Sequence, residues 1–120
     1  MNNLRRTTGL AGEQIAAAWL ERAGLRILCR NYRCAGGEID LVADDRGELV
    51  FVEVRTRRVG GMVSPEESVD ARKQRRIVHT AEHYLQSIGG HERAWRVDVV
   101  AVEVDRAGRV ERLDHLRSVV

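Results

Sequence analysis

The sequence predicts an α/β domain in which a mixed central sheet is flanked by two helices. Two stretches with helical composition, near 8–23 and 64–88, are separated by β-branched apolar runs of strand length. A further run, 95–104, follows the second helical stretch, and a strand in that position suggests a parallel crossover. At 120 residues the chain is expected to form a single domain, 1–120, with one core.

The first helix is expected over 8–23, with Gly24 placed to end it. Glu13 falls at the edge of its apolar face, which fits either a first-turn acid favoured by the helix dipole or a site residue. A stripe at about 100° per residue is expected to face the sheet. Its members are Ala11, Ile15, Ala18, Trp19 and Arg22.

Three strands are expected next. Residues 25–33 alternate in polarity, 35–37 form a turn, and the apolar runs 37–42 and 50–55 are joined by a turn at 44–47. Because strand side chains alternate between faces, Glu38 and Asp40 share one side, as do Glu53 and Arg55. A buried, unpaired carboxylate would cost several kcal/mol. The two runs therefore require a compensating cation, which is either a side chain or a metal ion.

The second helix has three start signals, namely Ser64 as N-cap, Pro65 at N1 and Glu67 completing a capping box. It is expected to run to Ile88, with a break near Ser68 as an alternative. Its buried stripe is expected to include Ile77, Ala81, Tyr84, Leu85 and Ile88. Lys73 and Gln74 flank this stripe and look inward. Three arginines point away as an outer cationic face: Arg72, Arg75 and Arg76.

This helix also carries a zinc-protease-like H-x-x-E-H pattern at His79, Glu82 and His83. The three side chains project opposite the apolar stripe, so we expect them in solvent and reject the protease interpretation. Cys29 and Cys34 have no metal-ligand spacing and are expected to be ordinary, half-buried thiols.

The run 95–104 is typical of a strand buried on both faces, and Asp98 lies within it. This acid is either structural, paired with Arg96 or with a helix, or catalytic. Residues 109–119 are expected to form a final strand or an extended tail at a sheet edge.

The net charge is only +2, but basic residues cluster at 55–58 and 72–76. The clusters indicate an anionic partner or, more simply, solvated faces. No apolar run approaches the roughly 20 residues of a membrane span and no export signal is recognised, so a cytoplasmic location without membrane contact is expected.

Several motifs together carry a family resemblance. They are G-E at 12–13, A-A-W-L at 17–20, R-N-Y-R at 30–33, G-E-I-D-L-V at 37–42, V-F-V-E-V-R at 50–55, V-D-A-R-K-Q-R at 69–75 and R-V-D-V-V at 96–100. On these the chain resembles the bacterial YraN family, an uncharacterised family assigned to the restriction-endonuclease-like PD-(D/E)xK superfamily and similar to archaeal Holliday junction resolvases. The resemblance implies a restriction-endonuclease-like αβββαβ core.

The resemblance also implies a divalent-metal site at the sheet. By matched motif, Asp40 is the invariant acid, Glu53 the acid of the E-x-K element, and Glu13 the glutamate of the first helix. Mg²⁺ (or Mn²⁺) between two facing carboxylates removes their mutual repulsion. The carbonyl of Val54 is expected as a further ligand.

Arg55 departs from the superfamily pattern, which has lysine here. Arginine stays protonated, so at this position it can orient groups or stabilise charge but cannot act as a general base. Lys73 is the only lysine in the chain. It is expected either to complete the site, with Gln74 binding phosphate or water, or to be there by chance.

The leading interpretation is a metal-dependent endonuclease that hydrolyses DNA, with branched junctions among the candidate substrates. The alternatives are a non-catalytic nucleic-acid-binding protein on a nuclease scaffold and a purely structural ion network around Arg55 and Arg96. A two-fold dimer through the apolar C-terminal stretch would suit symmetric cleavage. The backbone is expected to be gripped by Arg57, Arg58, Arg72, Gln74, Arg75 and Arg76.

Overall fold

A computed structural model describes residues 2–58, 70–90 and 92–120 of the chain, and side chains from residue 11 onward. Helix α1 spans Asn2–Arg22 and helix α2 spans Ala71–Ser87. The strands are β1 (Arg26–Cys34), β2 (Gly37–Asp45), β3 (Glu48–Arg58), β4 (Trp95–Val104) and β5 (Val110–Leu116). The predicted order of helix, three strands, helix and two strands is confirmed.

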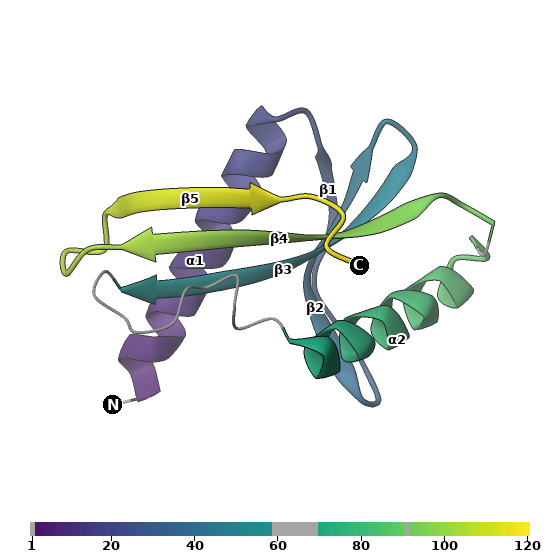
Figure 1. Cartoon of the computed structure of the whole chain (residues 1–120), viewed down its shortest axis with the longest axis horizontal. Coiled ribbons are helices and arrows are strands. Elements are labelled where there is room, and N and C mark those ends of the chain that lie inside the picture. Colours follow the sequence, from purple (N-terminus) through teal and green to yellow (C-terminus); the bar gives the residue numbers. More distant parts are fainter. Residues whose placement is uncertain (1, 59–69, 91) are drawn as a thin grey trace.

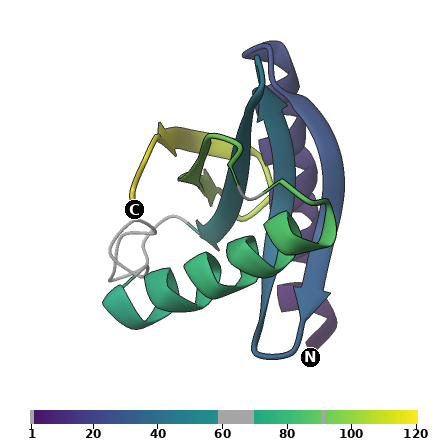
Figure 2. The same cartoon turned by 90° about the vertical axis from the view of Figure 1, so that its right-hand side faces the viewer.

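The five strands form one mixed sheet in the order β1-β2-β3-β4-β5. All neighbours are antiparallel except β3 and β4, which run parallel and are connected through α2. The predicted crossover is therefore confirmed. Figures 1 and 2 show α1 crossing one face of the twisted sheet while α2 lies on the other. In the described parts of the chain, neither helix combines the length and apolar character needed to cross a bilayer.

Each face of the sheet has its own apolar cluster, because successive strand residues point to opposite sides. On the α1 face, Leu20 packs among residues that include Leu41 and Val52. On the α2 face, Ile77 and Phe51 belong to the second cluster. Both faces of the central strands are thus buried, as predicted for the run 95–104.

The predicted buried stripe of α1 is correct at Ile15, which packs against the core, but wrong at Ala18, Trp19 and Arg22, which are exposed. Trp19 is 42% exposed, and the fully buried side chains of this helix are Ala16, Ala17 and Leu20. α1 approaches β3 closely, since a Cβ atom at Gly12 would collide with the side chain of Thr56. Small residues therefore bring this helix close to the sheet, and Leu20 fills the contact.

Helix α2 begins at Ala71, with Asp70 as its N-cap. The Asp70 side chain accepts a hydrogen bond from the backbone N–H of Lys73 at 2.9 Å. The capping box predicted at 64–67 lies outside the described residues. The buried face of α2 agrees with prediction at Ile77, Ala81 and Leu85, but Ile88 follows the last turn and is exposed.

Candidate functional site

The candidate site lies where β2 and β3 separate. The last paired residues of the two strands are Leu41 and Val52. The next residue on each strand is an acid, Asp40 on β2 and Glu53 on β3. Asp40 Oδ2 accepts a hydrogen bond from the Val54 N–H at 2.8 Å. A side chain thus takes the place that a backbone carbonyl of β2 would occupy in a continued ladder.

The two acids open into a cavity of about 430 Å³ between the sheet, the β1–β2 turn and α2. Four cationic side chains and three carboxylates line it, which makes it a mixed-charge pocket. The lining residues are Arg33, Cys34, Gly36, Gly37, Glu38, Asp40, Glu53, Arg55, Lys73, Arg76 and Ile77. The predicted acids and the single lysine of the chain therefore meet in one hollow.

The carboxyls of Asp40 and Glu53 strongly influence one another. The pKa of Asp40 is raised from 3.8 to about 7, mainly by burial and then by the charge of Glu53, while the Val54 N–H acts to lower it. Burial also raises the pKa of Glu53, although Arg55 and Lys73 both act to lower it. The two carboxyls are hydrogen-bonded to each other. In the absence of another cation the pair therefore retains a proton toward neutral pH.

Arg55 partly neutralises this pair. Its guanidinium Nη2 lies 3.2 Å from Glu53 Oε1, and the two side chains are 22% and 16% exposed. Its Nε atom is buried and has no hydrogen-bond acceptor among the described residues. One donor of Arg55 thus remains available to a group that enters the cavity.

Lys73 and Arg76 project into the cavity from successive turns of α2. The inward placement of Lys73 is confirmed, and its charge acts on Glu53. Arg76 is exposed, as predicted, but the prediction missed that it also lines the cavity. A Cβ atom at Gly37 would meet Thr80 Oγ1 and lie 3.6 Å from the Arg76 carbonyl. Because α2 packs this tightly on the β1–β2 turn, Arg76 lies at the rim of the cavity.

Glu13 lies close to the site but does not line the cavity. It is half-buried on α1, and its charge contributes to the raised pKa of Asp40. The contact between Gly12 and Thr56 fixes its position. Glu13 therefore acts electrostatically on Asp40 from α1, on the face of the sheet opposite α2.

The other predicted phosphate-binding residues lie outside the cavity. Arg57 pairs with Glu103 at 2.6 Å, so part of its donor capacity is already used. Arg58 ends β3 and is exposed, as are Arg72 and Arg75 on α2. Gln74 lines a separate hollow beside Arg75 instead of the acid pair. Only Arg76 of this group reaches the site.

Two cavity residues were missed as site residues by sequence reasoning. Arg33 and Glu38 stand directly opposite each other on β1 and β2 and form an ion pair at 2.9 Å. The signal was present, because a tight turn at Ala35 and Gly36 makes the two residues cross-strand neighbours. Their pairing closes the hairpin side of the cavity.

The donor set fits a small, hard divalent cation. Asp40 and Glu53 would offer carboxylate oxygens. The N–H of Val54 faces β2, and because the N–H and C=O of one strand residue point to the same side, the Val54 carbonyl also faces β2 and would offer a third oxygen. Among the residues that the structure describes, no group of three or more His, Cys, Asp and Glu side chains is placed to hold a metal ion. Two carboxylates with one carbonyl suit Mg²⁺, which retains several waters, better than a closed structural zinc site.

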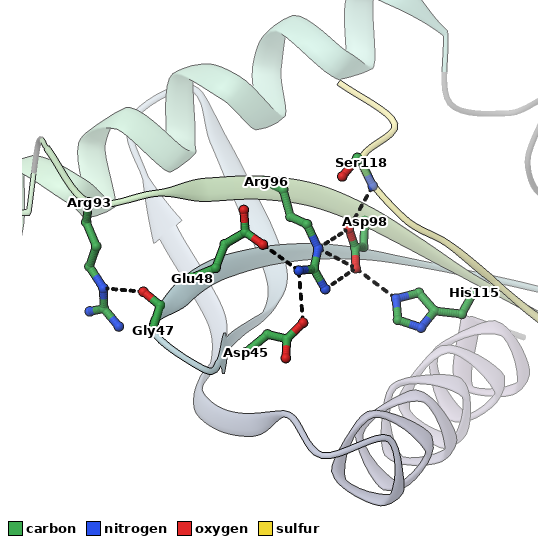
Figure 3. Close-up of polar contacts among 8 residues, drawn as sticks. All are labelled: Asp45, Gly47, Glu48, Arg93, Arg96, Asp98, His115 and Ser118. Atoms are coloured by element: carbon green, nitrogen blue, oxygen red, sulfur yellow. Dashed lines mark hydrogen bonds and ion pairs between the residues drawn. The ribbon is translucent and has the colours of Figure 1, made fainter.

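Asp98 belongs to a different, structural cluster (Figure 3). It is fully buried and accepts hydrogen bonds from Arg96, His115 and the Ser118 N–H, which lower its pKa despite burial. Arg96 also pairs with Asp45 at 2.9 Å and with Glu48 at 2.6 Å. The predicted pairing with Arg96 is confirmed. The cluster joins the β2–β3 turn, β4 and the C-terminal residues.

The remaining motifs agree with their predictions. His79, Glu82 and His83 are exposed on α2, as predicted. Cys29 and Cys34 are half-buried free thiols.

Comparison with known proteins places the chain among proteins of one family. A model of the uncharacterised protein family UPF0102 matches residues 12–102. A UPF0102 protein of Moorella thermoacetica is 49% identical over 98% of both chains. A UPF0102 protein of Symbiobacterium thermophilum is 49% identical over 89% of this chain and 91% of its own length. A UPF0102 protein of Pelotomaculum thermopropionicum is 44% identical over 98% of both chains. The matched region contains every candidate site residue.

Proposed function

The chain belongs to the uncharacterised protein family UPF0102, and we propose that it is a divalent-metal-dependent endonuclease that hydrolyses phosphodiester bonds of DNA, branched junctions included. The observation that carries the proposal is the buried Asp40–Glu53 pair, which shares a cavity with Lys73. The motif resemblance to restriction-endonuclease-like nucleases and archaeal Holliday junction resolvases supports it.

The acid pair fits a cation site because it is short of positive charge. Burial raises the pKa of both carboxyls, the charge of Glu53 raises that of Asp40 further, and Arg55 forms an ion pair with Glu53. Together with the Val54 carbonyl they would hold Mg²⁺ or Mn²⁺. When bound, such an ion would polarise a phosphodiester oxygen and make a water molecule more nucleophilic.

The cationic side chains have separate roles in this proposal. Arg76 and Arg33, at the rim, orient the DNA backbone by contacts with phosphate. Arg55 stabilises negative charge through its unused Nε donor. Lys73, near Glu53, carries the function of the lysine that is absent at position 55. As water attacks phosphorus and the bond to the leaving oxygen breaks, its ammonium stabilises the charge that develops.

The test is cleavage of labelled four-way junction, flap and duplex DNA with Mg²⁺, Mn²⁺ or EDTA, with binding measured in the same samples. We expect metal-dependent cleavage by the wild type and by the control Glu82→Gln, which changes an exposed acid of the same helix. Glu53→Gln should bind DNA but not cleave it. Binding without cleavage under every metal condition would refute the endonuclease proposal.

A second candidate is a nucleic-acid-binding protein that has lost turnover. The ion pair between Arg55 and Glu53, at the position where the superfamily pattern has lysine, favours it. Both proposals require phosphate contacts and therefore predict that affinity falls steeply as salt rises. An affinity for DNA that is flat between low and moderate salt would exclude both.

A further inference from the structure

The outer edge of β5 is one border of the sheet. β5 pairs with β4 on one side, and no other described strand lies beyond it (Figure 1). Every second residue of such an edge directs its backbone N–H and C=O outward, where they can pair with another strand. The sequence of β5 determines which strand fits there.

The charges of β5 are arranged so that the strand complements an inverted copy of itself. In an antiparallel pair centred on Leu113, Arg112 faces Asp114 of the second copy, and Glu111 faces His115. Val110 then faces Leu116, and Leu113 faces its own equivalent. Arg112 and Asp114 are oppositely charged and apolar residues meet apolar residues, which stabilises cross-strand pairs, whereas the imidazole of His115 is already bonded to Asp98 and Trp19. Arg112 and Asp114 already interact within one strand at 2.6 Å, so four charges would alternate across the junction.

Other registers are less favourable. Centring the pair on Arg112 sets two arginines against each other, and centring it on Asp114 sets two aspartates against each other. The opposite border of the sheet is unsuited to self-pairing. β1 carries Arg26, Arg30 and Arg33 without an acid, and the positive φ of Asn31 interrupts it. Both border strands have a register irregularity, but that of β5 lies at Glu111, outside the central pairs of Arg112, Leu113 and Asp114.

Exposed apolar surface gathers at the same edge. Val110, in β5, is 45% exposed. Trp19 is 42% exposed and donates from Nε1 to His115 Nδ1 of β5 at 3.4 Å, so its ring lies beside the strand. A strand paired with β5 would cover Val110 through its Leu116 and would approach Trp19.

We infer that β5 is a homodimer interface at which a second copy of this chain pairs antiparallel about Leu113 and extends the sheet across the two-fold axis. The axis is perpendicular to the sheet, so the same face of both copies looks the same way. The two acid-lined cavities therefore lie on one side of the continuous sheet. This inference does not depend on whether the cavities are catalytic.

Sedimentation of the full chain, from low micromolar to hundreds of micromolar, tests the interface. The expected product is a dimer of about 27 kDa, twice the 13.5 kDa of one chain. Arg112→Asp and Asp114→Arg should each raise the dimer dissociation constant about tenfold or more, because each sets like charges in opposition. The double swap restores opposite charges and should restore the dimer. Arg30→Asp, on β1, is the matched control and should leave the mass unchanged.

A crosslink tests the register independently. In a chain with Cys29→Ser and Cys34→Ser, Leu113→Cys should form an intermolecular disulfide on mild oxidation, because only a residue on the two-fold axis faces its own equivalent. Glu111→Cys should not. A monomer at every concentration, a dimer indifferent to both single charge changes, or crosslinking at position 111 but not at 113 would each overturn the inference.

Discussion

The raised pKa of Asp40 predicts how stability depends on pH. The pKa is 3.8 for a free carboxyl and about 7 in the folded chain, so the folded state retains a proton that the unfolded state loses. A group of this kind contributes stability that is fully present below its unfolded pKa and is lost as pH rises through the folded pKa. The free energy of unfolding should therefore fall between about pH 4 and pH 7 and then level off.

The magnitude follows from the pKa difference. One pH unit corresponds to about 1.4 kcal/mol, and about two of the three units are crossed between pH 5 and pH 8. In EDTA, the wild type should therefore lose about 3 kcal/mol relative to Asp40→Asn over this interval. Asparagine can still accept the Val54 N–H bond but cannot ionise.

The assay is urea unfolding of the wild type, Asp40→Asn and the control Glu82→Gln at both pH values, with and without Mg²⁺. At pH 8, Mg²⁺ should restore stability to the wild type and have little effect on Asp40→Asn. If the difference in free energy of unfolding between the wild type and Asp40→Asn is equal at pH 5 and pH 8, the pKa of Asp40 is not raised in the folded chain. If Mg²⁺ leaves wild-type stability unchanged, the acids form an ion network that needs no metal.

Three further predictions concern separate parts of the molecule. Lys73→Ala should lower the rate of DNA cleavage about 100-fold or more with little loss of DNA affinity. Arg72→Ala, which changes the neighbouring exposed residue, should instead weaken DNA binding and reduce the salt dependence of the affinity. Asp98→Ala should cost about 3 to 5 kcal/mol in urea unfolding, because it removes the buried acceptor shared by Arg96, His115 and the Ser118 N–H. Gly12→Ala should lower the melting temperature through its clash with Thr56, at a cost of about 1 to 3 kcal/mol, and Thr56→Ala in the same chain should recover part of it.

The order of helices and strands along the chain was predictable from sequence because it depends on strong local signals. The predicted bounds of β4, 95–104, agree with the structure, since a continuous apolar run ends at a charged turn on each side. The acid pair was predictable for a related reason. Asp40 and Glu53 follow directly from alternation in two strands joined by a short turn, so that a hairpin alone brings them together.

Features that depend on how closely two elements approach were not predictable. The rotation of α1 depends on the contact between Gly12 and Thr56, which are 44 positions apart in the chain. Likewise, Arg76 reaches the cavity only because Gly37 admits α2 to the hairpin turn. A helical projection ranks faces by polarity and does not include the shape of the partner surface.

The positions of Arg55 and Lys73 bear directly on whether a nuclease can work here. A lysine at position 55 would lie on β3, beside Glu53, within the same run of the sheet. In this chain the residue there is an arginine held at 3.2 Å from Glu53, while the ammonium of Lys73 approaches the same acid from α2. The site therefore contains a lysine near Glu53, but on a different element. Because α2 is positioned by the Asp70 cap and by Thr80 against Gly37, the alignment of this lysine depends on helix docking instead of strand geometry. Changes that loosen the contact between α2 and the β1–β2 turn should thus reduce catalysis while leaving the acid pair in place.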